Sequence, residues 1–269
     1  MSYNLLKGKK GIIFGALDEK SIAWITALRC FEEGAQIVLT NAPVALRMGE
    51  INKLAETTNS IVIPCDVTSS ADVENLISKS IEHFGGQFDF ILHSIGMSLN
   101  VRKGKSYTEI DYGFNAKTLD ISAVSLHRVL ATAMKMDALK EWGSVVALTY
   151  IAAQRVFPDY NEMADAKALL ESIARSFGYH YGIKNKVRVN TVSQSPTRTT
   201  AGSGVKGFDG FIDYAEKMSP LGNASAEDCA NYIVTLFSDL TKMVTLQNLF
   251  HDGGFSSMGV TQGVIEKMG

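Results

Sequence analysis

The sequence predicts an α/β fold, in which helices cover both faces of one doubly wound parallel sheet of about seven strands. The first observation is that short apolar runs alternate with longer helical patterns along the chain. The second is that every stretch with a candidate motif follows the end of such a run. Because parallel strands end at one edge of the sheet, we expect these motifs to gather there, where α/β proteins bind ligands.

Size and composition are those of one ordinary soluble domain over residues 1–269. Apolar residues make up 46% and charged residues 20%, and a net charge of -2 gives no electrostatic reason to expect nucleic acid or membrane binding. No apolar stretch approaches a membrane span, and residues 1–10 lack a signal-peptide core, so we expect a cytoplasmic protein. The three cysteines are scattered, which indicates free thiols and no metal site.

The first strand and helix form a candidate phosphate site. An apolar run over Lys10–Gly15 ends in glycine, and a helical pattern begins at Ser21 and stops at Gly34. The free amides and positive dipole end of such a helix attract a pyrophosphate, and the Ser21 hydroxyl is suited to capping or to bonding phosphate. The full G-x-G-x-x-G motif is absent, so an ordinary turn is the alternative.

The end of the second strand, Gln36–Thr40, is where cofactor choice is usually set. An acidic residue there favours NADH, and arginine favours NADPH. Here Asn41, Ala42 and Pro43 follow the strand, with Arg47 a little further on. We predict NADH because no cation stands at the strand end, while Arg47 leaves NADPH open.

The third and fourth strands are expected over 60–65 and 88–96. Asp66 follows the third strand, and it could accept a bond from the adenine amino group, cap the next helix, or do both. The fourth strand ends at Ser94-Ile95-Gly96, which would pass beneath a cofactor because glycine allows close backbone approach. We interpret His93 on this strand as a buried, hydrogen-bonded structural residue.

A polar, basic connection over 97–112 leads to a long helix over about 114–136 and a fifth strand over 144–149. The connection is either a solvated loop or a surface for an acidic carrier protein. A further helix is expected from Tyr160 to about Tyr181, followed by a sixth strand over residues 187–192.

One face of that helix would carry Tyr160, Met163, Ala164 and Lys167. The phenol of Tyr160 would then lie about 10 Å along the helix axis from the ammonium of Lys167. That spacing suits a flat cofactor and a substrate lying side by side. A nearby cation also makes a phenol easier to use as an acid. The alternative is a tyrosine that only packs, with its hydroxyl satisfied.

The segment over about 197–210 is rich in glycine and small residues, and it is predicted to be a mobile lid over the site. Helices over 211–218 and 226–240 and a seventh strand over 247–251 complete the expected fold.

A set of short segments carries a resemblance to a known family. Lys167 follows Tyr160 after six intervening residues, and Tyr150 lies ten residues before Tyr160. The other segments are Gly15-x5-Ser21-Ile22-Ala23, Cys65-Asp66-Val67, His93-Ser94-Ile95-Gly96, Leu148-Thr149-Tyr150, Ser195-Pro196-x-Arg198-Thr199 and His251-Asp252-Gly253-Gly254-Phe255-Ser256. With them the chain resembles the short-chain dehydrogenase/reductase superfamily, and within it the bacterial NADH-dependent enoyl-[acyl-carrier-protein] reductases, over essentially its whole length.

The resemblance implies a Rossmann-type fold and the reduction of a trans-2-enoyl thioester by NADH, the last step of the fatty-acid elongation cycle. Tyr160 would hydrogen-bond the thioester oxygen, where enolate charge develops, and Lys167 would hold the nicotinamide ribose. Tyr150 would be a second active residue, for which proton transfer and contact with the acyl chain or carrier arm both stay open.

The resemblance also implies partners and binding residues. The partners are an acyl carrier protein with the enoyl substrate and further copies of the chain in a homotetramer. Ala42 takes the ribose-facing place, often glutamine in the family. The expected substrate contacts are Met97, Ser98, Met163 and Phe208. The expected cofactor contacts are Gly15, Ser21, Ile22, Ala42, Asp66, Val67, Ile95, Lys167, Thr197, Arg198, Thr199, Thr200 and Ala201.

Two other functions compete with this reading. A carbonyl reductase of the same superfamily uses Tyr-x3-Lys, and the place of its lysine holds Ala164. A non-catalytic dinucleotide sensor would be expected to lose Tyr160 or Lys167, and both are present. The sequence therefore favours the enoyl reductase.

Overall fold

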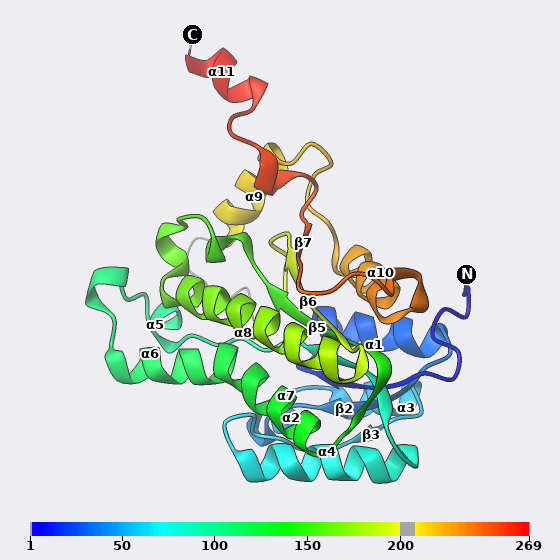
Figure 1. The fold of residues 1–269 in the computed structure, drawn as a ribbon. Helices are drawn as coiled ribbons and strands as arrows, with labels where there is room; N and C mark the ends of the chain where they lie inside the picture. The colour runs from blue at the N-terminus through cyan, green and yellow to red at the C-terminus, as the bar shows by residue number, and fades with distance from the viewer. Residues whose placement is uncertain (1, 200–207, 269) are drawn as a thin grey trace.

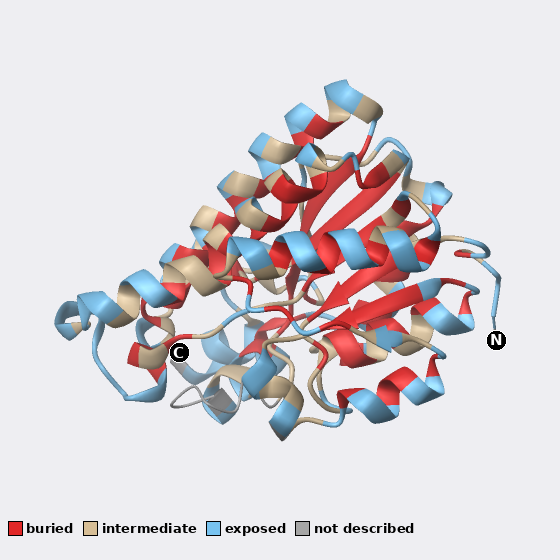
Figure 2. Ribbon diagram, turned by 90° about the horizontal axis from the view of Figure 1, so that it is seen from below, coloured by how far each residue is buried: buried red, intermediate tan, exposed pale blue. Residues whose placement is uncertain are grey.

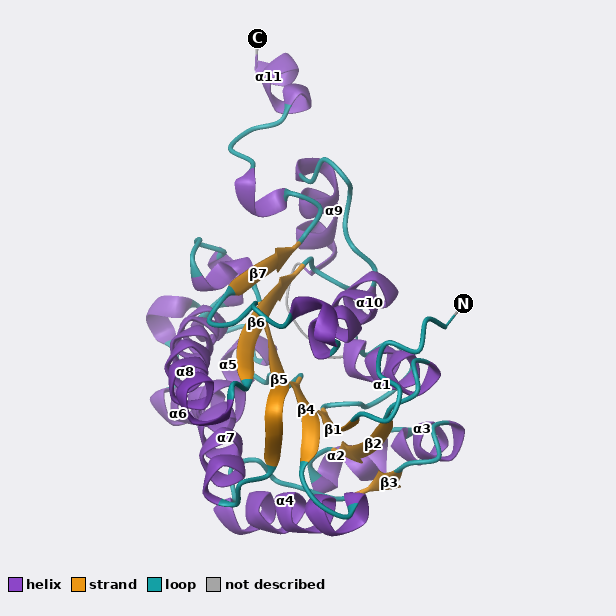
Figure 3. Ribbon diagram, turned by 45° about the vertical axis from the view of Figure 1, so that its right-hand side comes forward, coloured by secondary structure: helices purple, strands orange, loops and turns teal. Residues whose placement is uncertain are grey.

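The computed structural model describes residues 2–199 and 208–268. Within these ranges the centre of the molecule is one parallel sheet of seven strands in the order β3-β2-β1-β4-β5-β6-β7 (Figure 3). This confirms the predicted fold class. The strands are β1 (Lys10–Phe14), β2 (Gln36–Thr40), β3 (Ile61–Val62), β4 (Phe88–His93), β5 (Leu139–Thr149), β6 (Arg188–Gln194) and β7 (Asn248–His251).

The sheet is wound outward twice from its middle. The chain begins at β1, builds β2 and β3 on one side, returns to β4 beside β1, and then continues through β5, β6 and β7 on the other side. The crossovers therefore change direction between β1 and β4. In a doubly wound sheet, the crevice at the carboxyl ends of these two strands is where ligands bind.

Helices pack on both faces and bury the strands between two apolar clusters (Figure 2). One cluster joins the sheet to α4 (Ser70–Phe84), α7 (Ser125–Lys135) and α8 (Glu162–Asn185). The other joins it to α1 (Ile22–Glu32), α3 (Ile51–Thr57) and α10 (Ala226–Phe237). Burial on both faces explains why the central strands read as continuous apolar runs.

Shorter elements lie around the carboxyl edge and at the C-terminus. They are α2 (Pro43–Met48), α5 (Leu99–Arg102), α6 (Tyr112–Leu119), α9 (Phe208–Met218) and α11 (Gln262–Met268). In Figure 1, α9 lies beyond the ends of β6 and β7, and α11 extends away from the body of the molecule. A π-helical turn over Asp120–Val124 connects α6 to α7.

The structure corrects the predicted helix start at Tyr160. This residue ends a 3₁₀ turn over Pro158–Tyr160, and α8 begins only at Glu162. Asn161 between them has φ 52° and ψ -142°, an uncommon backbone conformation for a non-glycine residue. Tyr160 is therefore not on the helix that carries Met163 and Lys167, and the assumed helical spacing from its phenol to the ammonium does not apply.

Smaller differences concern other boundaries. The third strand is two residues long where six were expected, and the helix expected over 114–136 is divided into α6, the π-helical turn and α7. Residues 200–207 of the predicted lid lie outside the described residues. The extent of the domain over 1–269 stays a prediction. Among the described helices, none has the length and apolar character needed to cross a membrane.

Candidate active site

The site begins at the turn after β1, where Gly15 has φ 93°. A Cβ atom at this position would lie 2.0 Å from the carbonyl oxygen of Ser94, at the end of β4. Only glycine allows the first and fourth strand ends to approach so closely. The ends of β1 and β4 therefore lie close together at the switch point of the sheet.

The loop after Gly15 leads into a well-formed helix N-terminus. The Ser21 hydroxyl accepts hydrogen bonds from the Trp24 and Leu17 backbone N–H groups, each at 3.3 Å, and donates to the Asp18 carbonyl oxygen at 2.9 Å. These bonds fix the loop against α1, which is 11 residues long. A dinucleotide fits this arrangement, because a glycine at the turn and the free amides of the helix N-terminus together suit a pyrophosphate.

A pocket of about 240 Å³ opens beside this turn, and it brings together residues from three predicted sets. Tyr150, Tyr160 and Lys167 line it as the catalytic candidates. The cofactor and substrate candidates on its wall are Ile22, Ile95, Thr197, Thr199, Met97, Ser98 and Met163. Arg102 and Phe211 also line it, although neither was predicted as a site residue.

The buried amine of Lys167 lies at the end of β5. Its Nζ donates to the carbonyl oxygen of Leu148 at 2.9 Å. Burial lowers the pKa of Lys167 to about 8, and the negative charge of Glu171 opposes this shift. The amine is therefore mostly protonated at neutral pH, but close to its titration point.

Glu171 acts on Lys167 through its charge, and it was not predicted as a site residue. Its Oε1 accepts from Thr149 Oγ1 at 2.9 Å and from Asn248 Nδ2 at 3.1 Å, and its Oε2 accepts from Gln154 Nε2 at 3.3 Å. Burial raises the pKa of Glu171, which those bonds and the Lys167 charge partly offset. The carboxyl group stands four residues after Lys167 on α8, and that spacing was the available signal.

Tyr150 and Tyr160 are in contact with each other in the pocket wall. The ring centroids of Tyr150 and Tyr160 are 5.1 Å apart with an interplanar angle of 57°. Burial raises the pKa of both phenols, and Tyr160 and the Asp252 carboxylate raise the pKa of Tyr150 further. Both hydroxyls stay protonated over the usable pH range, so each is available as a hydrogen-bond donor.

His93 is buried beneath the site, as predicted. It is 0% exposed, and its Nε2 lies 2.9 Å from Ser125 Oγ. Burial, with the Lys167 charge in addition, lowers the pKa of His93 to about 3. The ring is therefore neutral and cannot serve as an acid at neutral pH.

The adenosine end of the predicted cofactor site contains Ala42 and Asp66. Ala42 precedes α2, and its N–H donates to Asn41 Oδ1 at 2.9 Å, while Asn41 Nδ2 donates to the Ala16 carbonyl at 2.9 Å. The capping alternative for Asp66 is wrong, because Ser69 caps α4. Asp66 Oδ1 instead accepts from the N–H and hydroxyl of Thr68.

The remaining predicted residues lie outside the pocket or outside the description. Ala42, Asp66 and Val67 do not line it. Arg198 is exposed and pairs with Asp209. Thr200 and Ala201 lie outside the described residues, and for Phe208 only the backbone, at the start of α9, is described.

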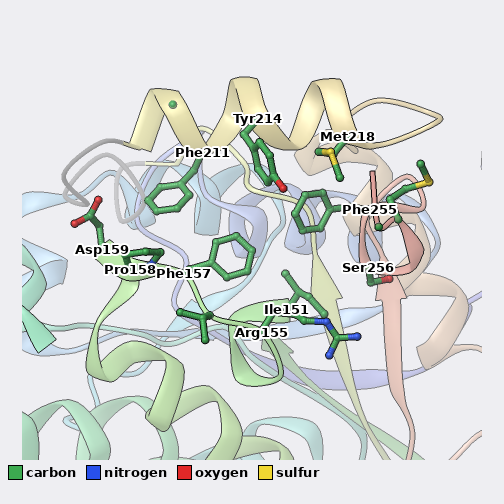
Figure 4. Close-up of a pocket in the computed structure, with 14 residues that line it drawn as sticks. Ile151, Arg155, Phe157, Pro158, Asp159, Phe211, Tyr214, Met218, Phe255 and Ser256 are labelled. Atoms are coloured by element: carbon green, nitrogen blue, oxygen red, sulfur yellow. The ribbon is translucent and has the colours of Figure 1, made fainter. Parts of the chain in front are cut away.

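A second cleft of about 530 Å³ lies next to the pocket and shares Phe211 with it (Figure 4). It lies between the loop before α8, α9 and the turn after β7. Four aromatic rings contact one another on its walls: the Phe157 ring is 5.9 Å from Phe211 and 6.2 Å from Phe255, and Tyr214 is 5.8 Å from Phe255. The Tyr150 ring of the first pocket lies 5.2 Å from Phe157 of the cleft.

The comparisons with known proteins all match one family of proteins. The family model described as enoyl-(acyl carrier protein) reductase matches residues 15–256. The chain is 34% identical to enoyl-[acyl-carrier-protein] reductase [NADH] 1 of Rhizobium meliloti, covering 95% of this chain and 93% of that protein. The structure of the FabI–NADH complex from Alistipes finegoldii superposes with a TM-score of 0.96 at 67% identity, covering 96% of this chain and 92% of that one. The reductase (NADH) from Aquifex aeolicus gives a TM-score of 0.87 at 32% identity, covering 96% and 100%.

Proposed function

The chain belongs to the enoyl-[acyl-carrier-protein] reductase family and reduces the double bond of trans-2-enoyl-[acyl-carrier-protein] with NADH, the last step of fatty-acid elongation; within this reaction, we propose that Tyr160 and Lys167 are the catalytic pair. The single observation that carries the proposal is that both side chains line one pocket beside the switch point of the sheet. The family is the one that the sequence resembles, so that prediction is confirmed.

When bound, NADH supplies the hydride that the β-carbon of the enoyl group receives. The turn at Gly15 and the start of α1 at Ser21 and Ile22 would hold its pyrophosphate, and Ile95 would lie beneath its nicotinamide half. Ala42, Asp66 and Val67 would contact the adenosine half. The remaining contacts that we propose are Thr197, Arg198 and Thr199.

Tyr160 would stabilise the negative charge that develops on the thioester oxygen. A donor is needed there, and burial keeps the phenol protonated. A positioned donor of this kind contributes about 3–4 kcal/mol to lowering the barrier. The ring of Tyr150 supports Tyr160 from the side, and its hydroxyl would contact the acyl thioester or the carrier arm.

Lys167 would hold the nicotinamide ribose and keep a positive charge near the phenol. The bond to Leu148 O fixes the amine, and Glu171 favours its protonated form. The ammonium also stabilises negative charge developing in the pocket. No other cation lies so deeply buried among the residues that line this pocket in the described chain.

The apolar acyl chain needs a matching wall. Met97, Ser98 and Met163 would contact the reacting end of the substrate, and Phe208 stays a predicted contact. The cleft of about 530 Å³ shares Phe211 with the pocket and would have room for a longer chain. Burying each methylene there would contribute about 0.8 kcal/mol.

We further propose that the enzyme is a cytoplasmic homotetramer. Large apolar side chains stay exposed on α8, at Tyr179 and Ile183, and on the edge strand β7, at Phe250. Exposed apolar groups on neighbouring surfaces of this kind favour pairing with further copies of the chain. Light scattering after size exclusion tests the assembly, and a monomer at micromolar concentration would contradict it.

The decisive experiment follows nicotinamide oxidation with a crotonyl thioester, using NADH and NADPH in parallel on the wild type and Tyr160→Phe. We expect turnover with NADH that is strongly slowed in the variant. Reduction of a ketone without reduction of the enoyl thioester would replace the assignment with a carbonyl reductase. Cofactor binding without any turnover would indicate a sensor.

A further inference from the structure

A buried carboxylate connects the two walls of the substrate pocket. Glu162 is the first residue of α8 and is 0% exposed. Its Oε1 accepts hydrogen bonds from Ser98 Oγ at 2.5 Å and from Thr118 Oγ1 at 3.1 Å. The distance to Ser98 is at the short end of the range for O–H···O bonds.

The bond to Ser98 lies behind the pocket lining and connects the segments that form two of its walls. Ser98 caps α5, because its Oγ accepts from the Val101 N–H at 3.0 Å, and Met97, Ser98 and Val101 line one wall. Tyr160 and Met163, on either side of Glu162 in the chain, line the other wall. The carboxylate therefore lies where a single contact can hold both walls at a fixed separation.

A second hydrogen bond, next to the Glu162–Ser98 bond, joins the same two segments. Asn161 Nδ2 donates to the Lys105 carbonyl oxygen at 2.8 Å, which ties the residue before Glu162 to the loop after α5. The α5 segment has four helical residues and cannot hold its own position by helix formation alone. Its placement depends on bonds from its surroundings, which include the Glu162–Ser98 bond and two bonds between the Asn100 side chain and the backbone of Asp111, the residue that caps α6.

The unused oxygen of Glu162 argues against a role in packing alone. Oε2 is buried and has no hydrogen-bond partner within residues 2–199 and 208–268. Leaving a buried acceptor unpaired is costly, and an apolar side chain would fill the same space without that cost. A carboxylate at this place is useful because its other oxygen holds Ser98.

We propose that Glu162 is a positioning residue that, through Ser98, fixes the α5 wall against the Tyr160 wall and so determines how tightly the enoyl chain is held. The inference rests on the proposed function and adds a specificity determinant to it. Glu162 does not line the pocket itself and acts only through the residues beside it.

The test compares Glu162→Val and Glu162→Gln with the wild type, using a long-chain trans-2-enoyl thioester and NADH. Glu162→Val should raise KM about tenfold, the effect of losing one bond to a charged group, while kcat and the NADH Kd change less than about twofold. Glu162→Gln keeps one acceptor oxygen and should recover most of this loss.

A matched control is Glu33→Gln. Glu33 is also 0% exposed and accepts bonds from the backbone N–H groups of Tyr3 and Leu5, at the N-terminal side of the molecule. This variant should lower the melting temperature without changing KM. If Glu162→Val likewise lowers only the melting temperature, its role is purely structural and the proposal is wrong.

Hydrogen exchange gives a readout that does not require turnover. In Glu162→Val, the amides of Val101, Lys103 and Gly104, which donate within the α5 segment, should exchange at least about tenfold faster, and in Glu33→Gln they should not. Unchanged exchange in Glu162→Val would overturn the positioning role. Failure of the wild type to reduce any enoyl thioester would instead overturn the proposed function, and the exchange result would stand by itself.

Discussion

The rings of Tyr150 and Tyr160 lie 5.1 Å apart, although one follows the end of β5 and the other ends the 3₁₀ turn before α8. The two residues differ in what surrounds them. Tyr150 also packs against Phe157, whose ring is 5.2 Å away and belongs to the aromatic cleft. Both residues line the pocket together with Lys167, so the contact of Tyr150 with the cleft is what distinguishes them. This difference separates the expected effects of the two phenols.

Tyr160→Phe should lower kcat by about 10²–10³-fold, because it removes the donor to the developing oxyanion. Tyr150→Phe keeps the ring that supports Tyr160 and should lower kcat by less than about tenfold. Steady-state kinetics with a crotonyl thioester, together with NADH fluorescence titration, measures both. Equal losses in the two variants would mean that Tyr150 supplies the donor or the proton.

NADH affinity should depend on pH through Lys167. Its pKa is lowered to about 8, so the amine is charged below pH 8 and loses its proton above it. The NADH Kd should therefore be constant between about pH 6 and pH 7.5 and should rise above pH 8. Lys167→Met should bind weakly and show no such rise. A pH-independent Kd in the wild type would remove the ammonium from cofactor binding.

In Glu171→Gln, the pH above which the NADH Kd rises should be lower than in the wild type. The negative charge of Glu171 raises the pKa of Lys167 against the effect of burial, and an amide lacks this charge. The substitution also weakens the bonds from Thr149 and Asn248, at a cost of about 1–3 kcal/mol in unfolding free energy. Titration of NADH binding and urea unfolding measure the two effects separately. If the pH at which the NADH Kd begins to rise is unchanged, Glu171 only supports the fold.

Much of the fold could be predicted because its signals are local. The bounds of β2 follow from one apolar run, and the start of α1 follows from one capping residue, Ser21. The position of Tyr160 could not be predicted in the same way. Asn161 breaks the helix there, and its side chain bonds Lys105, 56 residues away in the chain.

The same reasoning separates the site residues that were predicted from those that were missed. Tyr150, Tyr160 and Lys167 form a spacing pattern within one segment. Glu162 becomes a site residue only through partners distant in the chain, such as Ser98, 64 residues away. An acidic residue near a helix start is usually solvated, so nothing local shows that folding will bury Glu162. Glu171 has a local signal, its place four residues after Lys167, but its bond to Asn248, 77 residues away, has none.

The turn at Gly15 allows a test of the cofactor site that does not involve the catalytic groups. In Gly15→Ala the new Cβ would lie 2.0 Å from Ser94 O, and φ 93° is strained for any side chain. The strand ends must therefore separate, which should cost about 1–3 kcal/mol in stability and weaken NADH binding at least tenfold. Gly85→Ala is the matched control, because Gly85 has φ 69° with no atom within 4 Å of its Cβ and caps α4 away from the site. It should lose about 1 kcal/mol of stability and bind NADH normally. Equal NADH affinity in the two variants would show that the β1 turn does not hold the cofactor.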